Sequence, residues 1–179
     1  MTRTQAQDKS RMKSAARFYA VQALFQMEQT DQTVDQVIRE FLDHRFGTTY
    51  EGAEMLDGDV DAGHFQHLVE DAVNYQARVD QMTNRALVPK WSIARIDSTL
   101  RGLFRAAGAE LTCQDTPPKV VINEFVDIAR AFFPEGRESE DGEPRAGTRL
   151  AHEYDTTAPV RFVNAVLDHM AREAQPGAF

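Results

Sequence analysis

The sequence of 179 residues contains a single cysteine, Cys113, and has no apolar run of the length needed to span a bilayer, about 20 residues. One cysteine excludes a disulfide framework and a zinc site built from thiolates, and it suits a reducing compartment. The first residues also lack the apolar stretch of a secretion signal. These absences argue against a secreted or membrane-spanning protein, and we expect the chain to work in the cytoplasm.

Signatures of catalysis and of cofactor binding are also missing. No glycine pattern of the GxGxxG or GxxxxGK[ST] type occurs, and no neighbouring base marks Cys113 as a nucleophile. His64 and His67 are three residues apart but have no well-placed third metal ligand. Asp57–Asp61 begins like a calcium loop, but the glycine and glutamate required later in such a loop are absent. We therefore expect no enzyme activity, no metal and no cofactor.

Negative charge predominates, with 28 Asp and Glu against 20 Lys and Arg and a net charge of −8. Residues 1–25 are the exception, because they carry five cations and one acid, a net charge of +4 that leaves −12 on the remaining chain. Such asymmetry is typical of a basic arm that binds a polyanion, and a solvated terminus with incidental charge is the alternative.

Apolar residues recur with helical spacing along the whole chain, and no segment alternates with the period of a strand. The pattern predicts an all-α fold of about seven helices. The clearest helical segments are residues 10–30, 34–46, 61–87, 94–113, 118–132 and 159–174. A break at Val88-Pro89 divides the chain into an N-terminal subdomain, residues 1–88, and a C-terminal one, residues 89–179, with a long polar loop at 134–158. The halves form either two packed subdomains or one bundle.

One cation falls on an apolar stripe. Arg17 projects about 20° from Leu24 around the first helix, where each residue turns the chain by about 100°. A buried guanidinium must be paired, and Glu124 on a later apolar helix is the candidate partner. We predict a structural ion pair between Arg17 and Glu124.

The start of the last helix gathers a cation, an aromatic ring and an amide, which are Arg161, Phe162 and Asn164. Helix N-termini offer free N–H groups to phosphate, and an exposed ring can stack on an unpaired base. Alternatively, Phe162 completes the core and Asn164 caps a loop.

Four stretches in chain order resemble the NusB family of bacterial transcription antitermination factors. They are AVQALFQ (20–26) after Ala16-Arg17, the LR…A..EL helix (100–111), PPKVVINEFVDIARAF (117–132) and RFVNAVLD (161–168). Together they are specific and cover nearly the whole chain. Ala165 stands where the family usually has glycine. The resemblance implies an all-helical fold of two small subdomains and no catalysis.

The resemblance further implies a partner, the small-subunit ribosomal protein NusE. The pair would bind the single-stranded boxA element of ribosomal RNA leaders and join the RNA polymerase antitermination complex. Carried over by position, RNA contacts come from Arg11, Lys13, Arg101, Lys119, Arg161, Phe162 and Asn164. NusE would dock around Trp91, Ile96 and Asp97.

This mechanism requires the basic arm and the start of the last helix to converge on one exposed patch. Two other functions are compatible with the sequence. One is a helical protein-interaction adaptor without RNA contact, and the other is a stand-alone relative of the RNA-binding domain of a ribosomal RNA methyltransferase.

Overall fold

A computed structural model describes residues 3–47, 59–87, 91–133 and 159–179, and within these ranges every regular element is a helix. The all-α prediction is therefore confirmed. The elements are α1 (Arg3–Gln29), α2 (Val34–Glu40), the π-helix η1 (Phe41–Arg45), α3 (Ala62–Asn74), α4 (Gln76–Ala86), the 3₁₀-helix η3 (Ile93–Arg95), α5 (Ser98–Cys113), α6 (Pro118–Phe132), α7 (Pro159–Ala174) and the 3₁₀-helix η4 (Pro176–Ala178). Among the described helices, none is both long and apolar enough to cross a membrane.

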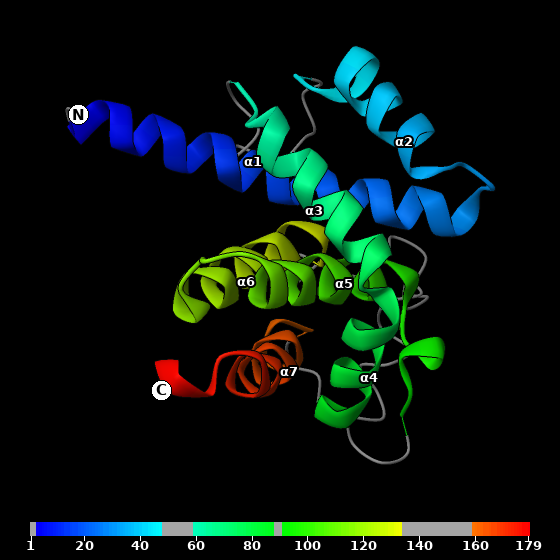
Figure 1. Ribbon diagram of the computed structural model, residues 1–179, viewed down its shortest axis with the longest axis vertical. Coiled ribbons are helices and arrows are strands. Elements are labelled where there is room, and N and C mark those ends of the chain that lie inside the picture. The colour runs from blue at the N-terminus through cyan, green and yellow to red at the C-terminus, as the bar shows by residue number, and fades with distance from the viewer. Residues whose placement is uncertain (1–2, 48–58, 88–90, 134–158) are drawn as a thin grey trace, which may run out of the picture.

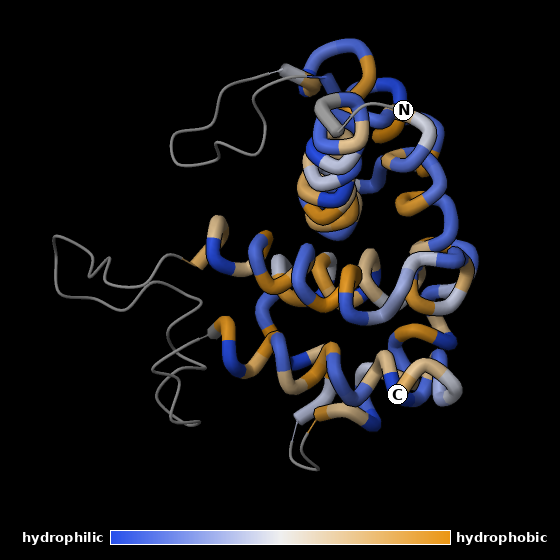
Figure 2. Tube along the Cα trace, turned by 90° about the vertical axis from the view of Figure 1, so that its left-hand side faces the viewer, coloured by the Kyte–Doolittle hydropathy of each residue, from blue (hydrophilic) through white to orange (hydrophobic). Residues whose placement is uncertain are grey.

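The helices lie in three tiers (Figure 1). In the upper tier α3 crosses α1, and α2 lies beside them. The middle tier holds α5 and α6, and the lower tier holds α4 and α7. Figure 2 shows the same order from the side. Three sets of contacts join the tiers: α1 packs on α5, α6 packs on α7, and α4 packs on both α5 and α7. The middle tier, α5 and α6, therefore lies between α1 and α7.

Aromatic rings bury α1 between its neighbours. Phe18 stacks on Phe132 of α6 with ring centroids 4.8 Å apart, and Tyr19 meets Phe41 edge to face at 6.2 Å. Both α1 rings are buried, whereas Phe25 on the same helix is 37% exposed. The wide apolar surface of α1 is thus explained mainly by contacts inside the fold.

The central helix α5 depends on small residues for its close contacts. A β-carbon added at Gly102 would come within 3.1 Å of the Val21 carbonyl oxygen of α1, and one added at Gly108 would collide with a γ-methyl group of Val79 on α4. Glycine lowers helix propensity, so its presence in mid-helix reflects this crowding.

We expect Gly108→Ala to destabilise the fold by about 1–3 kcal/mol, the usual cost of overpacking a core, despite a propensity gain of about 1 kcal/mol. Urea denaturation measures the change. Gly63→Ala is the matched control, because a β-carbon there makes only an ordinary contact at 3.6 Å. Equal stabilisation by both substitutions would contradict the account of the crowded α4–α5 contact.

Several helix boundaries differ from the predicted ones. The first helix begins at Arg3 rather than near residue 10, and the segment predicted over 34–46 is α2 followed by the π-helix η1. The predicted helix over 61–87 is two helices that meet at Tyr75 (φ −108°, ψ 15°). The reason is packing, because α3 lies on α1 while α4 turns to cover α5 and α7. The helix predicted from residue 94 begins at Ser98, because the Asp97 side chain accepts a hydrogen bond from the Thr99 N–H at 2.8 Å and caps α5 there. The division at residue 88 stays a prediction, since residues 88–90 lie outside the described ranges.

Candidate nucleic-acid interface

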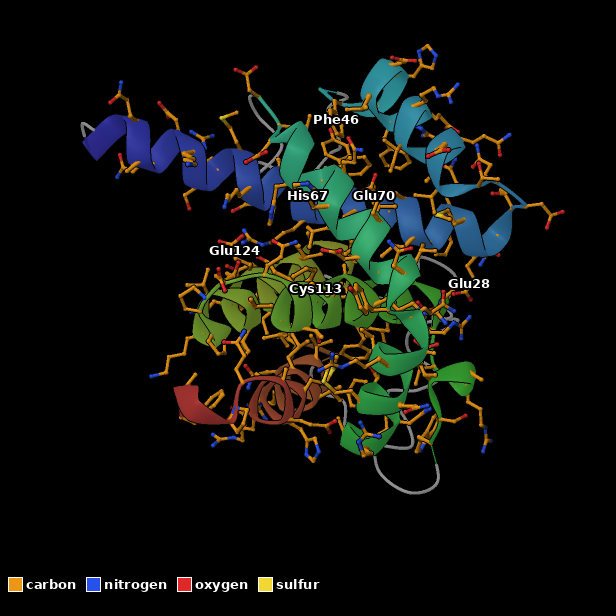
Figure 3. All side chains as sticks on the ribbon, in the orientation of Figure 1. Glu28, Phe46, His67, Glu70, Cys113 and Glu124 are labelled. Carbon is orange, nitrogen blue, oxygen red and sulfur yellow. The ribbon has the colours of Figure 1, made fainter. Side chains whose placement is uncertain are left out.

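A buried ion cluster joins α1, α5 and α6. Arg17 is 3% exposed, and its Nε and Nη2 atoms donate to the two carboxylate oxygens of Glu110 at 2.8 and 2.7 Å. Its Nη1 atom lies 3.3 Å from Glu124 Oε2. The predicted pair with Glu124 is present, but Glu110 is the closer and bidentate partner. Glu124, labelled in Figure 3, comes from α6 and lies near α1.

The sequence contained a signal for Glu110 that our sequence analysis did not use. Leu103, Ala107 and Glu110 are spaced i, i+4 and i+7, so they share one face of α5. All three are fully buried. A carboxylate on an otherwise apolar stripe requires a cation from another helix, for the same reason that Arg17 requires an anion.

The two charges stabilise each other against the cost of burial. Burial alone would lower the pKa of Arg17 and raise the pKa of Glu110. Their mutual hydrogen bonds and attraction outweigh burial, so the pKa of Arg17 is raised and the pKa of Glu110 is lowered. Both groups are charged in the folded protein at neutral pH.

His64 of α3 borders the same cluster. Its Nε2 atom is buried 3.7 Å from Glu110 Oε1 and has no hydrogen-bond partner among the described residues. Burial, together with the charges of Arg17 and Lys13, lowers the pKa of His64 to about 4 against the opposing attraction of Glu110. The imidazole is therefore neutral at pH 7.

The turn between α5 and α6, residues 114–117, is tied to the cluster from inside. The Thr116 hydroxyl donates to Glu110 Oε1 at 2.8 Å. The Gln175 side-chain amide donates to the carbonyl oxygens of Leu111 at 3.0 Å and of Thr116 at 3.4 Å. A buried carboxylate and the end of α7 together fix this turn.

Two predicted RNA-binding cations belong to the same helices as the cluster. Lys13 precedes Arg17 by four residues, about 6 Å along α1, and Lys119 precedes Glu124 by five residues, about 8 Å along α6. Lys119 is exposed and Lys13 half-buried, and neither makes an ion pair with a residue in the described part of the chain. We call Arg11, Lys13 and Lys119 the arm–turn face.

The start of α7 forms a separate group. Arg161 and Asn164 are exposed, whereas Phe162 is half-buried and meets Phe104 edge to face with centroids 6.1 Å apart. Phe162 thus completes part of the core, the alternative that the sequence left open. Arg161 lies 14 residues, about 21 Å along the axis, from Gln175, the end of α7 that contacts the turn.

The expected convergence of the basic arm and the start of α7 is wrong. The two elements lie on opposite sides of the α5–α6 tier in both views (Figures 1 and 2). The physical reason is the apolar face of α7, which packs on α6 and α5 rather than on α1. The predicted RNA contacts therefore fall into two separate groups.

Arg101 belongs to neither group. Its Nε atom donates to Glu28 at 2.8 Å, its Nη2 atom also binds Glu28, and its Nη1 atom donates to the carbonyl oxygens of Ile93, Ala94 and Ile96. Glu28 lies at the end of α1 away from the arm (Figure 3). The guanidinium is committed to holding the 93–96 segment, so we leave Arg101 out of the RNA surface.

The predicted partner-docking residues have three different environments. Trp91 is half-buried, with the Arg95 guanidinium 5.6 Å from its ring centroid. Asp97 is also half-buried and caps α5. Ile96 is only 3% exposed and is part of the core, so its side chain is not available to a partner.

The described residues contain no group of three potential metal ligands. His64 is buried and His67 exposed, so their rings do not share a site. Asp61 accepts a hydrogen bond from the His64 N–H at 2.9 Å and caps α3, while the start of the calcium-like sequence lies outside the described residues. Burial and the nearby Asp71 raise the pKa of the Cys113 thiol, opposite to the shift that activates a nucleophile.

Comparisons with known proteins agree on one family. The NusB family profile matches residues 14–140. The chain is 38% identical to the transcription antitermination protein NusB of Maricaulis maris, over 97% of this chain and 94% of that protein, and 39% identical to that of Caulobacter vibrioides, over 91% and 94%. Two solved structures share the fold. They are T. maritima NusB, with a TM-score of 0.61 at 23% identity over 90% and 91% of the two chains, and NusB from Aquifex aeolicus, with 0.57 at 20% identity over 92% and 90%.

Proposed function

The chain belongs to the NusB family of transcription antitermination proteins, and from this membership we propose that it binds the single-stranded boxA element of ribosomal RNA leaders together with NusE. It would act by binding, without catalysis or cofactor, as a component of the RNA polymerase antitermination complex. The observation that supports the proposal is the arm–turn face, whose cations belong to two helices, α1 and α6, that the Arg17–Glu124 pair joins, on a chain with a net charge of −8.

Electrostatics favours this face for the RNA backbone. Lys13 and Lys119 need not break an ion pair with a described residue before they meet a phosphate. The exposed residues 5–11 of α1 extend the face toward the N-terminus. Recognition of unpaired RNA combines such backbone contacts with stacking and contacts to base edges. The start of α7, with Arg161, Phe162 and Asn164, lies on the other side of the α5–α6 tier, so we leave these residues out of this RNA surface.

A basic partner compensates for the small number of cations. NusE, as a ribosomal RNA-binding protein, would supply further positive charge, and we place its docking surface around Trp91 and Asp97. Arg101 and Glu28 hold this segment against the end of α1. The docking segment thus lies at the end of α1 that is away from the basic arm, so the two proposed surfaces do not overlap.

The test is a titration of a boxA-like single-stranded RNA with the chain, in the presence and absence of NusE, at several salt concentrations. We expect tighter binding with NusE. Lys13→Ala/Lys119→Ala should weaken binding and lower the salt slope of log K by about 1.4, since each phosphate contact to a single strand contributes about 0.7.

Arg130→Ala is the matched control. Arg130 is an exposed cation on α6, like Lys119, but it is paired with Asp127 and lies toward the other end of that helix. Its loss should leave the affinity and the salt slope unchanged. Absence of RNA binding even with NusE present would favour the adaptor function instead.

A further inference from the structure

The α5–α6 turn carries a hydroxyl whose only described hydrogen bond points into the protein. Thr116 Oγ1 lies 2.8 Å from Glu110 Oε1, and Glu110 has no exposed surface. The carboxylate already accepts two hydrogen bonds from Arg17, so it does not need the hydroxyl to balance its charge. The Thr116 bond instead holds the turn at a fixed distance from α1 and α5.

The two residues between Thr116 and Lys119 link the position of Lys119 to that of Thr116. Pro117 and Pro118 link the two residues, and each ring fixes φ at about −65°. Pro118 is buried and begins α6, and the backbone N–H groups of Val120 and Val121 donate to the Pro117 carbonyl oxygen. Few soft torsions remain, so a shift of Thr116 moves the base of the Lys119 side chain with it.

The same carboxylate also fixes the other side of the arm–turn face. Arg17 binds Glu110 from α1, one helical turn after Lys13. Glu110 therefore sets the position of α1 through Arg17 and the position of the turn through Thr116. The spacing between Lys13 and Lys119 depends on both bonds.

We propose that Thr116 is a positioning residue for RNA binding, which places Lys119 in register with the cations of α1 through the buried carboxylate of Glu110. This inference rests on the proposed function, because it assigns a role within the same RNA surface. Thr116 itself need not touch the RNA. Its effect passes through the two prolines to Lys119.

The experiment compares Thr116→Val, Thr116→Ser and Lys119→Ala in the RNA titration with NusE. Valine keeps the shape but lacks the hydroxyl, whereas serine keeps the hydroxyl. We expect Thr116→Val to weaken binding by about threefold to tenfold and to lower the salt slope by about 0.7, the loss of one phosphate contact. Lys119→Ala should give the same change, and Thr116→Ser should behave like the unsubstituted protein.

The double variant Thr116→Val/Lys119→Ala decides whether the two residues act through one contact. We expect its affinity and salt slope to equal those of Lys119→Ala alone. Additive losses, an unchanged slope in Thr116→Val, or failure of serine to preserve binding would each overturn the proposal. A general loss of stability would lower the fraction of folded protein at every salt concentration and would leave the slope unchanged.

Failure of the proposed function has a different signature. In that case the unsubstituted chain binds no RNA with NusE present, and the positioning role falls with it. If the unsubstituted chain binds and only the Thr116 variants lack the expected effect, the proposed function stands and the positioning role is refuted.

Discussion

Glu110→Ala is expected to destabilise the fold by about 3–5 kcal/mol, the cost of leaving a buried charge without its partner. Arg17 would keep only Glu124, which lies farther away at 3.3 Å and is itself partly exposed. For a chain of this size the melting temperature should fall by about 6–20 °C. Thermal denaturation followed by circular dichroism at 222 nm measures the change.

A paired substitution separates the charge effect from packing. Arg17→Met/Glu110→Leu removes both charges and should recover most of the loss, because apolar replacements of a buried ion pair are often neutral or stabilising. Arg130→Ala breaks the exposed pair with Asp127 and should change stability by less than about 1 kcal/mol. If Glu110→Ala melts at the same temperature as the unsubstituted chain, the buried cluster does not stabilise the fold.

Stability should also fall between pH 6.5 and pH 4 because of His64. The folded protein lowers the pKa of this group to about 4 from 6.5, so the unfolded chain takes up the proton first as the pH falls. The full stability is present above pH 6.5. It then decreases by about 1.4 kcal/mol per pH unit, about 3 kcal/mol in all, and levels off below pH 4.

The groups that face His64 act in a different pH range. Glu110, whose pKa is lowered, contributes stability that is lost only below its usual range near pH 4.5, and Arg17 does not titrate. Chemical denaturation at pH 7, 6 and 5 therefore measures how protonation of His64 changes the free energy of unfolding, without a contribution from Glu110. His64→Gln should flatten this part of the profile. His67→Gln, an exposed change one turn away on α3, should leave the slope as it is, and a flat profile for the unsubstituted chain would refute the assignment.

The helical fold could be predicted because helix periodicity is a local property of the sequence. Pro117-Pro118 marked the start of α6, and the last helix has the predicted bounds. The break at Tyr75 has no local signal such as proline or glycine. It arises because α3 and α4 cover different tiers, which is a property of the whole fold.

The candidate site was predictable only where one side chain required another. Arg17 on an apolar stripe demanded an anion, and Glu124 was found as one of its two partners. Arg101 carried no such signal, because its partners are mostly backbone carbonyl oxygens of a segment whose path the sequence does not determine. The position of the arm relative to α7 could not be predicted either, because it depends on the tier to which each helix belongs.

The length of α1 has a consequence for the order of assembly. Lys13 in its N-terminal half and Glu28 at its far end are 15 residues apart, about 22 Å along one continuous helix. An RNA bound near Lys13 and a protein partner bound near Glu28 would not clash with each other. Neither would therefore have to bind before the other. The ternary complex can then form with either ligand binding first. If the partner raises the affinity for RNA by some factor, RNA must raise the affinity for the partner by the same factor.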